Sequence, residues 1–327
     1  MAQAKESETK MPTEPVISSE SHLDLVSKLP TREGLPLSLV LYKNYWLLPH
    51  HADKIMLLQD SFNARPDDTI LATNPKCGTT WLKALAFTIT NRSRYDFSNH
   101  PLLTSHPHEI ISFLEVPLGK ELTYVEKLPS PRLLATHMPL SLLPKSVANH
   151  GCRIVYICRE PKDAFVSGWH FGNEIHIGRS TDLDTAFNMF CEGYWPNGPF
   201  WDHCLEYWKE SIARPDRVLF LKYEEMMADP VNSVKRLATF LGDPFTGDEE
   251  EGGVPEEVVR LCSFKMLSEL QTNMIGELHR RENVVFKKSA YFRRGKVGDW
   301  VNHMSEEMGR KLDYIVEEKF KGSGLLL

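Results

Sequence analysis

The sequence predicts an α/β protein: a single domain in which a central parallel β-sheet is flanked by helices. Short, nearly continuous apolar runs are typical of parallel strands that are covered on both faces. These runs alternate along the chain with longer segments of helical period, which is the pattern of an α/β fold. No stretch of the 327 residues is long enough to serve as a linker between independent domains, and one large domain can occupy this length.

Four short segments have the composition of buried parallel strands. Each is predominantly apolar and contains β-branched residues or leucine, without the strict alternation of a half-buried strand. The four segments are Thr69–Thr73 (TILAT), Leu133–Thr136 (LLAT), Ile154–Cys158 (IVYIC) and Val218–Lys222 (VLFLK).

Five further segments predict helices. One begins at Pro161, and proline is favoured at the first helical position because the N–H that it lacks has no partner there. Another is followed by Gly242, which suits the left-handed conformation that ends many helices. The five segments are Trp81–Thr90, Pro161–Phe171, Phe200–Ser211, Val231–Leu241 and Glu306–Lys321.

Two segments are expected to lie outside the regular structure. Residues 1–21 are polar, with few large apolar groups, and predict a disordered tail that leaves 22–327 as the folded domain. The acidic, glycine-containing stretch Gly247–Gly253 predicts a surface loop.

The composition excludes several classes of protein. The formal net charge of −6 argues against a general nucleic-acid binder. The chain has no basic start followed by an apolar run, as a secretory signal would require, and no apolar stretch of about 18 residues that could span a membrane. We therefore expect a cytoplasmic protein without nucleic-acid or membrane partners.

The six cysteines do not form a recognisable metal or disulfide pattern. None belongs to a CxxC pair, and none is spaced with a histidine as zinc ligands are. We expect reduced thiols, most of them buried, and no metal site. The cysteines are Cys77, Cys152, Cys158, Cys191, Cys204 and Cys262.

The segment Asn74–Thr80 (NPKCGTT) follows the first strand and precedes a helix, and it predicts a phosphate-binding loop. A helix N-terminus presents free N–H groups and about half a positive charge to an anion. Gly78 lets the backbone approach the ligand closely, and Lys76 adds a positive charge. Thr79 and Thr80 can cap the helix and donate hydroxyl hydrogen bonds to phosphate oxygens.

This loop differs from the Walker A pattern GxxxxGK[ST], in which lysine follows the second glycine and precedes a magnesium-binding hydroxyl. Here Lys76 precedes Gly78 and the first glycine is absent. The strand Ile154–Cys158 ends in Arg159-Glu160, whereas a magnesium-binding aspartate would be needed. A nucleotide site built from cations suits a donor whose transferred group carries less charge than phosphate, as a sulfuryl group does.

Three motifs in order make the chain resemble the cytosolic sulfotransferase family, and within it the plant branch. They are TNPKCGTTWLKAL, CREPKDAFVSGWHF (Cys158–Phe171) and FRRGKVGDW (Phe292–Trp300); LPSPRLLATHMPLSLLP and the ending EEKFKGSGL are also plant-like. The resemblance implies a single α/β domain similar to that of P-loop nucleotide kinases. It also implies a sulfotransferase that moves the sulfuryl group of 3′-phosphoadenosine-5′-phosphosulfate to a hydroxyl of a small molecule.

The resemblance further implies which residues bind the donor. The phosphosulfate side is expected to contact the loop of Lys76, although Cys77 stands where the family usually has serine or threonine. The 3′-phosphate is expected on Arg159 and on a basic C-terminal loop, and aromatic faces suit the adenine. The implied donor contacts are Lys76, Cys77, Gly78, Thr79, Thr80, Trp81, Arg159, Ser167, Tyr223, Ser263, Phe264, Arg293, Arg294 and Gly295.

Ordinary structural roles compete with some of these assignments. Arg159 could instead form an ion pair with Glu160 or Asp163, and Trp81 and Phe264 could be packing residues. The residues alone leave these alternatives open.

The resemblance of THMPL to the catalytic strand of the family identifies His137 as the general base. A neutral histidine suits this task near pH 7, although a lone histidine at a strand end is more often structural. His137 would remove the acceptor proton in an in-line displacement, while Lys76 stabilises charge on the bridging and leaving-group oxygens. Many animal members carry lysine two residues before this histidine, and this chain has Ala135 there.

Clusters of aromatic residues predict a pocket for a flat or hormone-like acceptor. We assign Tyr45, Trp46 and Phe113 to this pocket, although an ordinary aromatic core is the competing interpretation. The acceptor would be a phenolic, a flavonoid or a plant hormone such as a brassinosteroid, a hydroxyjasmonate or salicylate.

Two other functions stay open at the level of sequence: a metal-dependent P-loop kinase, and a nucleotide-binding protein without catalysis. The dimer motif of animal members is not evident in the segment Asn273–Tyr291. A monomer is therefore favoured over a homodimer.

Overall fold

The computed structural model of the chain describes residues 19–115, 122–176, 178–281 and 284–327. Its central feature is a four-stranded sheet in the order β5-β4-β6-β7, in which all neighbouring strands run parallel. The prediction of an α/β fold with a central parallel sheet is confirmed. The strands are β4 (Thr69–Thr73), β5 (Leu133–Thr136), β6 (Arg153–Cys158) and β7 (Val218–Lys222).

The four predicted strand segments are these strands, with one residue added to β6. All five residues of β4 are buried, because β4 has a strand on each side and helices over both faces. This explains why its sequence is apolar without alternation. Neighbouring residues within the sheet then face different cores: Ile70 and Tyr156 belong to one hydrophobic cluster, and Leu71 and Val155 belong to the other.

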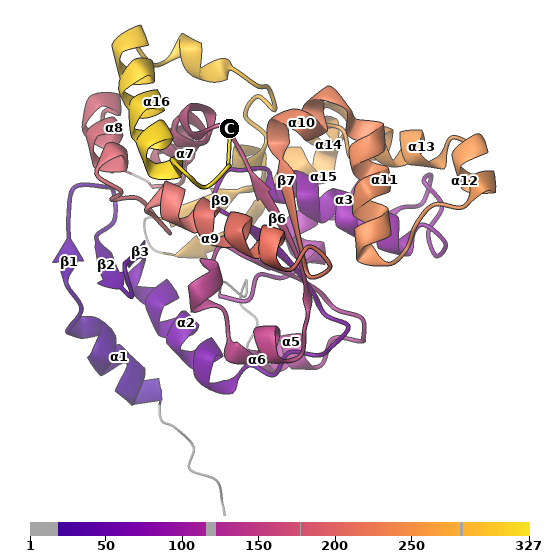
Figure 1. The fold of residues 1–327 in the computed structure, drawn as a ribbon, viewed down its shortest axis with the longest axis horizontal. Coiled ribbons are helices and arrows are strands. Elements are labelled where there is room, and N and C mark those ends of the chain that lie inside the picture. The colour runs from indigo at the N-terminus through magenta and orange to yellow at the C-terminus, as the bar shows by residue number, and fades with distance from the viewer. Residues whose placement is uncertain (1–18, 116–121, 177, 282–283) are drawn as a thin grey trace, which may run out of the picture.

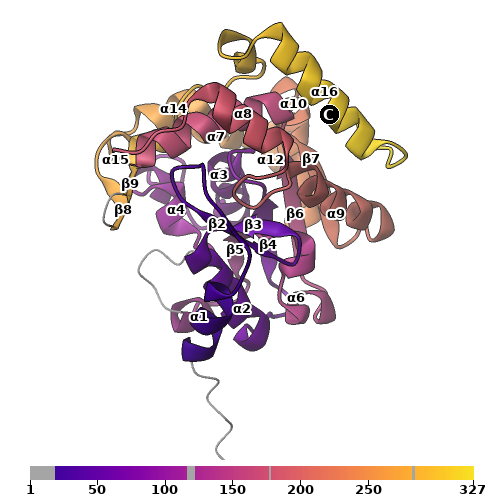
Figure 2. The same ribbon diagram turned by 90° about the vertical axis from the view of Figure 1, so that its left-hand side faces the viewer.

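One face of the sheet is covered by helices from the N-terminal part, the middle and the end of the chain (Figure 1). These helices are α1 (Ser19–Ser27), α2 (Pro49–Ser61), α5 (Leu122–Glu126), α6 (Lys145–Asn149), α7 (Pro161–Ile175), α8 (Leu183–Cys191), α9 (Phe200–Ala213) and α16 (Glu306–Phe320). In both views α1 and α2 lie at the opposite end of the molecule from α16 (Figure 1, Figure 2).

The other face of the sheet is covered mainly by α3 and the helices that pack on it. They are α3 (Thr79–Asn91), α10 (Tyr223–Ala228), α11 (Pro230–Leu241), α13 (Val254–Leu261) and α14 (Phe264–Glu269). Three short helices complete the described set: α4 (Pro107–Ile110), α12 (Gly247–Glu251) and α15 (Gln271–Met274).

Two small antiparallel sheets lie outside the main one. The first has the order β1-β2-β3, and the second pairs β8 with β9. An isolated bridge between His176 and Val284 ties the second sheet to the end of α7. The strands are β1 (Thr31–Arg32), β2 (Leu39–Tyr42), β3 (Tyr45–Leu47), β8 (Glu277–Arg281) and β9 (Val284–Lys287).

The predicted helices are present with shifted ends. Helix α3 begins two residues earlier than expected because Gly78 is its N-cap in a left-handed conformation, with φ +105°. Helix α7 runs four residues further, to Ile175. Gly242 ends α11 with φ +83°, as the sequence predicted.

The expected surface loop Gly247–Gly253 is wrong for most of its length, because Gly247–Glu251 forms α12. The side chain of Thr246 accepts a hydrogen bond from the Glu249 N–H, and the Glu249 side chain accepts one from the Thr246 N–H. Such a capping box stabilises a helix start, and acidic residues favour the first turn. The cluster of acidic side chains was therefore a helix-start signal.

The predicted tail lies outside the described residues as far as residue 18. Helix α1 begins at Ser19, so the expected boundary at residue 21 falls inside this helix. In the part of the chain that the structure describes, no helix has the length and apolar character needed to cross a membrane.

Candidate active site

The carboxyl ends of the four parallel strands meet at one edge of the sheet, where ligands bind in open α/β folds. A cavity of about 1260 Å³ opens there. Its walls include residues that directly follow β5, β6 and β7, namely His137, Arg159 and Tyr223, together with Lys76 in the loop after β4. The fold thus brings four predicted site residues from distant parts of the sequence into one space.

The loop between β4 and α3 has the backbone of an anion-binding turn. Lys76 has φ +68° and Gly78 has φ +105°, and the first turn of α3 begins directly after Gly78. A Cβ atom on Gly78 would lie 3.0 Å from Cδ2 of Tyr223 and 3.2 Å from Cδ1 of Ile157. Glycine is required here both by the conformation and by the close approach of the next strand ends.

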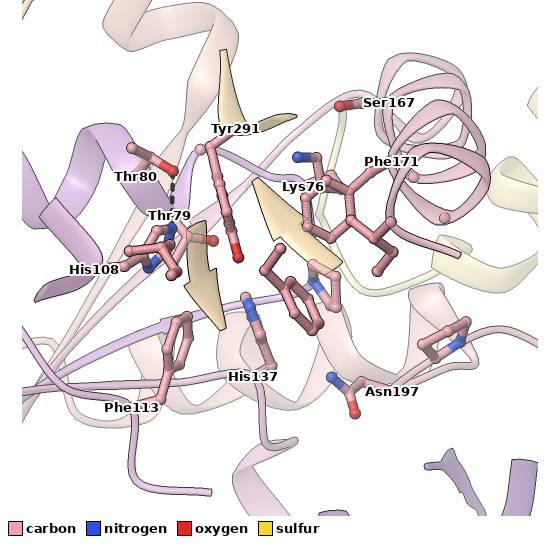
Figure 3. A pocket seen from close by; sticks show the side chains of 18 of the residues that line it. Lys76, Thr79, Thr80, His108, Phe113, His137, Ser167, Phe171, Asn197 and Tyr291 are labelled. Atoms are coloured by element: carbon pink, nitrogen blue, oxygen red, sulfur yellow. Dashed lines mark hydrogen bonds between the residues drawn. The ribbon is translucent and has the colours of Figure 1, made fainter. Parts of the chain in front are cut away.

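The side chain of Lys76 points into the cavity among aromatic rings (Figure 3). Its Nζ lies 3.9 Å from the ring centroid of Phe171 and 5.5 Å from that of Tyr291. Burial, together with the charges of Arg159 and Arg293, lowers the pKa of Lys76 to about 7. An anion in the cavity would therefore meet a cation that has no ion pair with a carboxylate in the described part of the chain.

Cys77 lies in the same loop, but its thiol belongs to the core beneath the sheet edge. The residue is fully buried and is not among those that line the cavity. Burial raises the pKa of Cys77 well above its usual range. The side chain of Cys77 therefore does not face the cavity in which we predicted that it would contact the nucleotide.

Arg159 and Arg293 form the basic side of the cavity. Nη2 of Arg159 donates to the carbonyl oxygen of Lys296 at 2.7 Å and lies 3.4 Å from the Asp163 carboxylate. Nη1 of Arg293 donates to Asp299 at 2.6 Å. In the part of the chain that the structure describes, the Nε atoms of both arginines are buried without a hydrogen-bond partner, so each retains a donor for an anion.

Asp163 fixes the C-terminal loop against α7. Its carboxylate accepts hydrogen bonds from the N–H groups of Gly298 and Trp300, at 2.7 and 2.9 Å. Arg159 therefore has both predicted roles: it forms an ion pair with Asp163, and it also lines the cavity. Sequence reasoning assigned Asp163 no positioning role, although an acidic residue four positions after a site arginine was a usable signal.

The remaining predicted donor contacts line the cavity around these groups. Trp81 packs edge-to-face on Tyr223, with ring centroids 5.4 Å apart, and Gly295 has φ +61° beneath Phe264. The hydroxyl of Ser263 caps α14 by accepting from Met266 N. Thr79, Thr80, Ser167 and Arg294 complete the set of predicted residues in the cavity wall.

His137 lies at the end of β5 with a defined tautomer. Its Nδ1 lies 2.9 Å from the carbonyl oxygen of Thr73, which can only accept, so Nδ1 carries the proton and Nε2 carries the lone pair. Burial lowers the pKa of His137 to about 3. The imidazole is therefore neutral at neutral pH, with Nε2 available to accept a proton.

Two buried residues that sequence reasoning missed hold the backbone of His137. A carboxylate oxygen of Glu115 accepts the N–H of His137, and the other accepts the hydroxyl of Thr136 at 2.9 Å. Nε2 of His203 lies 3.0 Å from the carbonyl oxygen of His137 and donates to it. Glu115 and His203 are far from His137 in sequence, so no local signal pointed to them.

Only one of the three residues predicted for the acceptor pocket lines the cavity. Phe113 lines the cavity, and its ring centroid lies 4.8 Å from that of His137. Tyr45 and Trp46 are not among the lining residues. Tyr45 is buried with its hydroxyl on Glu206, and Trp46 packs edge-to-face on Tyr194.

Tyr45 and Trp46 therefore lie outside the cavity wall, because Tyr45 packs on α9 and Trp46 packs on Tyr194 in the loop after α8. The acceptor side is lined instead by leucines of the N-terminal segment and by rings from α7, β9 and the loop after α8. Examples are Leu35, Leu37, Leu57, Trp169, Trp195 and Phe286.

All six cysteines are free, and only Cys191 is not fully buried. Among the described residues, no group of three or more His, Cys, Asp or Glu side chains is arranged to hold a metal ion.

The sequence of the chain is similar to those of known sulfotransferases. Residues 66–324 match the family described as the sulfotransferase domain. The chain is 44% identical over 322 residues to cytosolic sulfotransferase 17 of Arabidopsis thaliana, with 96% of this chain and 92% of that protein covered. It is 43% identical over 314 residues to flavonol 4′-sulfotransferase of Flaveria chlorifolia, with 94% and 97% covered.

Solved structures show the same architecture. A candidate steroid sulphotransferase of Arabidopsis thaliana is 38% identical, with a TM-score of 0.74 and coverage of 93% of this chain and 94% of that one. The mouse sulfotransferase SULT7A1 complexed with PAP is 27% identical, with a TM-score of 0.68 and coverage of 88% and 96%.

Proposed function

The chain belongs to the plant branch of the cytosolic sulfotransferase family, and we propose a specific reaction for this sulfotransferase. It moves the sulfuryl group of 3′-phosphoadenosine-5′-phosphosulfate to a hydroxyl of a small phenolic, flavonoid or plant-hormone acceptor, with His137 as the base. The observation that carries this proposal is one cavity that holds both Lys76 and a neutral His137 whose Nδ1–H is bound to Thr73.

The donor would lie between the α3 N-terminus and the basic loop. The free N–H groups of the first turn, Lys76 and the hydroxyl of Thr80 face the phosphosulfate. The unpartnered Nε–H groups of Arg159 and Arg293 and the hydroxyl of Ser167 fit a 3′-phosphate, since charge-assisted hydrogen bonds to phosphate are strong. PAP, the nucleotide in the mouse sulfotransferase, is the product expected after the sulfuryl group has left.

The aromatic residues of the donor side suit the adenine ring. All three aromatic residues line the cavity: Trp81 packs on Tyr223, and Phe264 lies against Gly295 of the basic loop. Aromatic side chains can stack on the face of any nucleobase. We assign these three rings to the adenine, with Ser263 and Gly295 shaping the space beside it.

In the proposed mechanism the acceptor oxygen forms a bond to sulfur as the bond from sulfur to the bridging phosphate oxygen breaks. Nε2 of His137 takes the acceptor proton. Lys76 and the N–H groups of α3 stabilise the charge that gathers on the leaving phosphate oxygen. These groups perform the task that a metal ion performs in many phosphoryl-transfer sites.

The acceptor side favours an apolar molecule with its reacting hydroxyl beside His137. Phe113 lies against His137, and leucine side chains form the wall further out. Apolar walls with few polar groups are typical of sites for small organic ligands. The relatives named for flavonols make a flavonoid one member of the proposed class.

Two further properties belong to this proposal. The protein acts in the cytoplasm, as the name of its Arabidopsis relative indicates for that protein. It acts as a monomer, because the dimer motif of animal members is not evident in its sequence.

The decisive experiment incubates the full chain with the donor and a panel of phenols, flavonols, hydroxyjasmonates and steroids, with mass spectrometry as the readout. We expect a mass gain of one sulfuryl group on at least one acceptor, with equimolar release of PAP. The variant His137→Ala serves as the control for uncatalysed transfer. Phosphorylated product with ATP and magnesium, or no product with any acceptor while PAP binds, would contradict the proposal.

A further inference from the structure

A buried lysine in the middle of α3 has no place in the proposed mechanism. Lys83 has no exposed surface, and its Nζ is surrounded by electron-rich groups. It lies 3.0 Å from the carbonyl oxygen of Ile111 and 2.9 Å from Nδ1 of His108. The ring centroid of Phe113 is 3.4 Å away.

These three neighbours match the three N–H groups of an ammonium ion. A lysine ammonium has three donors and no acceptor, and the carbonyl oxygen and the ring face can only accept. Burial lowers the pKa of Lys83 well below its usual range, but the carboxylate of Glu115 and the three acceptors around Nζ favour the ammonium form. In this form Lys83 donates, and Nδ1 of His108 must accept.

The hydrogen bond from Lys83 decides the tautomer of His108. Burial lowers the pKa of His108 well below its usual range, so the ring is neutral and carries one proton. Since Nδ1 accepts, the proton lies on Nε2. Nε2 is 3.1 Å from Oγ1 of Thr80, and Figure 3 shows this contact reaching into the cavity wall. His108 therefore donates to the Thr80 hydroxyl.

The direction of the hydrogen bond between His108 and Thr80 matters because Thr80 lies in the cavity wall. Threonine hydroxyls in helices often donate to a carbonyl of the preceding turn, and that use would remove them from a ligand. Here the oxygen of Thr80 already accepts from His108, at the N-terminus of α3 beside Lys76. The hydroxyl hydrogen is then free to point into the cavity, where an anion is its natural acceptor.

We propose that Lys83 and His108 form a buried relay that orients the Thr80 hydroxyl as a donor to the 5′-phosphate group of the nucleotide. Lys83 and His108 are positioning residues in this proposal, because they act through the hydroxyl of Thr80. This inference rests on the proposed donor site. It concerns how one contact of that site is set.

A double-mutant cycle with PAP as the ligand tests the relay. The variants are Thr80→Val, His108→Phe and both together, and the dissociation constant of PAP is measured by calorimetry on the full chain. Thr80→Val is expected to weaken binding about ten-fold, the size of one hydrogen bond to a charged group. His108→Phe should weaken it to a similar degree, and the double variant should bind no more weakly than Thr80→Val alone.

The conservative variant His108→Gln is expected to recover most of the affinity, because its side-chain amide can place an N–H near the position of Nε2. His106→Asn is the matched control. His106 stacks on His108 with ring centroids 5.1 Å apart, and asparagine can keep its role as the N-cap of α4. PAP affinity should be unchanged in this control.

His108→Phe leaves the Lys83 ammonium without one acceptor, and such a loss destabilises a folded protein. If circular dichroism shows that this variant is unfolded, Lys83→Met combined with His108→Phe takes its place in the cycle. This pair removes the cation together with its acceptor at similar volume.

The outcomes separate the relay from the donor site. Additive losses in the cycle, or a Thr80→Val variant that binds PAP as tightly as the original chain or more tightly, would overturn the relay while leaving the proposed function intact. Absence of PAP binding to the unaltered chain would instead remove the proposed function, and the relay with it.

Discussion

The ammonium group of Lys76 lies against the rings of Phe171 and Tyr291, without an ion pair to any carboxylate of the described residues. Burial is the main cause that lowers the pKa of Lys76 to about 7, and the charges of Arg159 and Arg293 add to it. In such a site the protonated form of Lys76 is destabilised relative to the neutral amine as long as no anion is bound. Binding of a phosphate group should therefore raise the pKa of Lys76.

This predicts a pH-dependent affinity for PAP. Below about pH 7 the free protein already carries the Lys76 charge, so affinity is full there. Above pH 7 binding must take up a proton, and affinity should fall by up to about ten-fold per pH unit. Calorimetry between pH 6.5 and 9 in buffers of different ionisation heat would measure both the affinity and the proton uptake.

The control for the pH profile is Lys76→Met. This variant should bind PAP more weakly at pH 6.5, and its affinity should vary much less with pH. An unaltered chain whose affinity for PAP is constant from pH 6.5 to 9 would show that Lys76 is charged in the free protein throughout this range.

His137 is neutral because it is buried, and its orientation comes from backbone contacts. Thr73 accepts its Nδ1–H, and Glu115 and His203 hold its own N–H and carbonyl groups. A base placed in this way contributes to turnover without contributing much to donor binding.

For His137→Ala we expect turnover to fall by at least about 10², the usual size of a general-base contribution. The dissociation constant of PAP should stay close to that of the unaltered chain. Steady-state rates and calorimetry on the same preparation provide both values. Near-normal turnover would remove His137 from the mechanism.

At the scale of elements, several groups of the site lie at the first residues of helices. Helix starts are also where the sequence analysis made its clearest error. The N-terminus of α3 follows Gly78, and α7 begins one residue after Glu160, which caps it. The misread segment Gly247–Glu251 is also a helix start, stabilised by the capping box of Thr246 and by the contact of Glu249 with Arg92 at 2.7 Å.

If α12 depends on this cap, Thr246→Ala should lower the free energy of unfolding by about 1 kcal/mol. Urea denaturation followed by circular dichroism would measure the change. Thr239→Ala is the matched control, because Thr239 is exposed in the last turn of α11, away from any N-cap, and alanine is the better helix former. Equal losses in both variants would be evidence against the capped helix.

At the scale of the whole molecule, the cavity exists only because distant segments meet. Its walls combine the strand ends of the main sheet, leucines of the N-terminal segment, the β8–β9 sheet and the basic C-terminal loop. A ligand that touches all of these parts should stabilise the fold as a unit, since binding to the native state alone shifts the unfolding equilibrium.

We therefore expect PAP without metal to raise the melting temperature, with a stabilisation of about 2.7 kcal/mol at a concentration of 100 times its dissociation constant. ATP with magnesium at the same concentration should give a much smaller shift, because it lacks the 3′-phosphate that Arg159 and Arg293 would bind. A larger shift with ATP and magnesium would favour a kinase-like site.

The sequence predicted the four strands of the main sheet, the turn between β4 and α3, and five of the sixteen described α-helices. These features follow from local composition: an apolar run buried on both faces, a glycine that permits a positive φ at Gly78, and a proline or glycine at a helix end. The motifs also identified the family correctly. Local chemistry was sufficient because neighbouring residues alone decide each of these elements.

Which side chains face the cavity depends on how the helices and strands pack against one another. Tyr45 and Phe113 were equally plausible as pocket residues, yet β3 turns Tyr45 onto Glu206 while Phe113 lies against His137. The roles of Glu115 and Lys83 were hidden for the same reason. Their partners lie on other elements, and contacts between elements depend on how those elements pack, which no local pattern records.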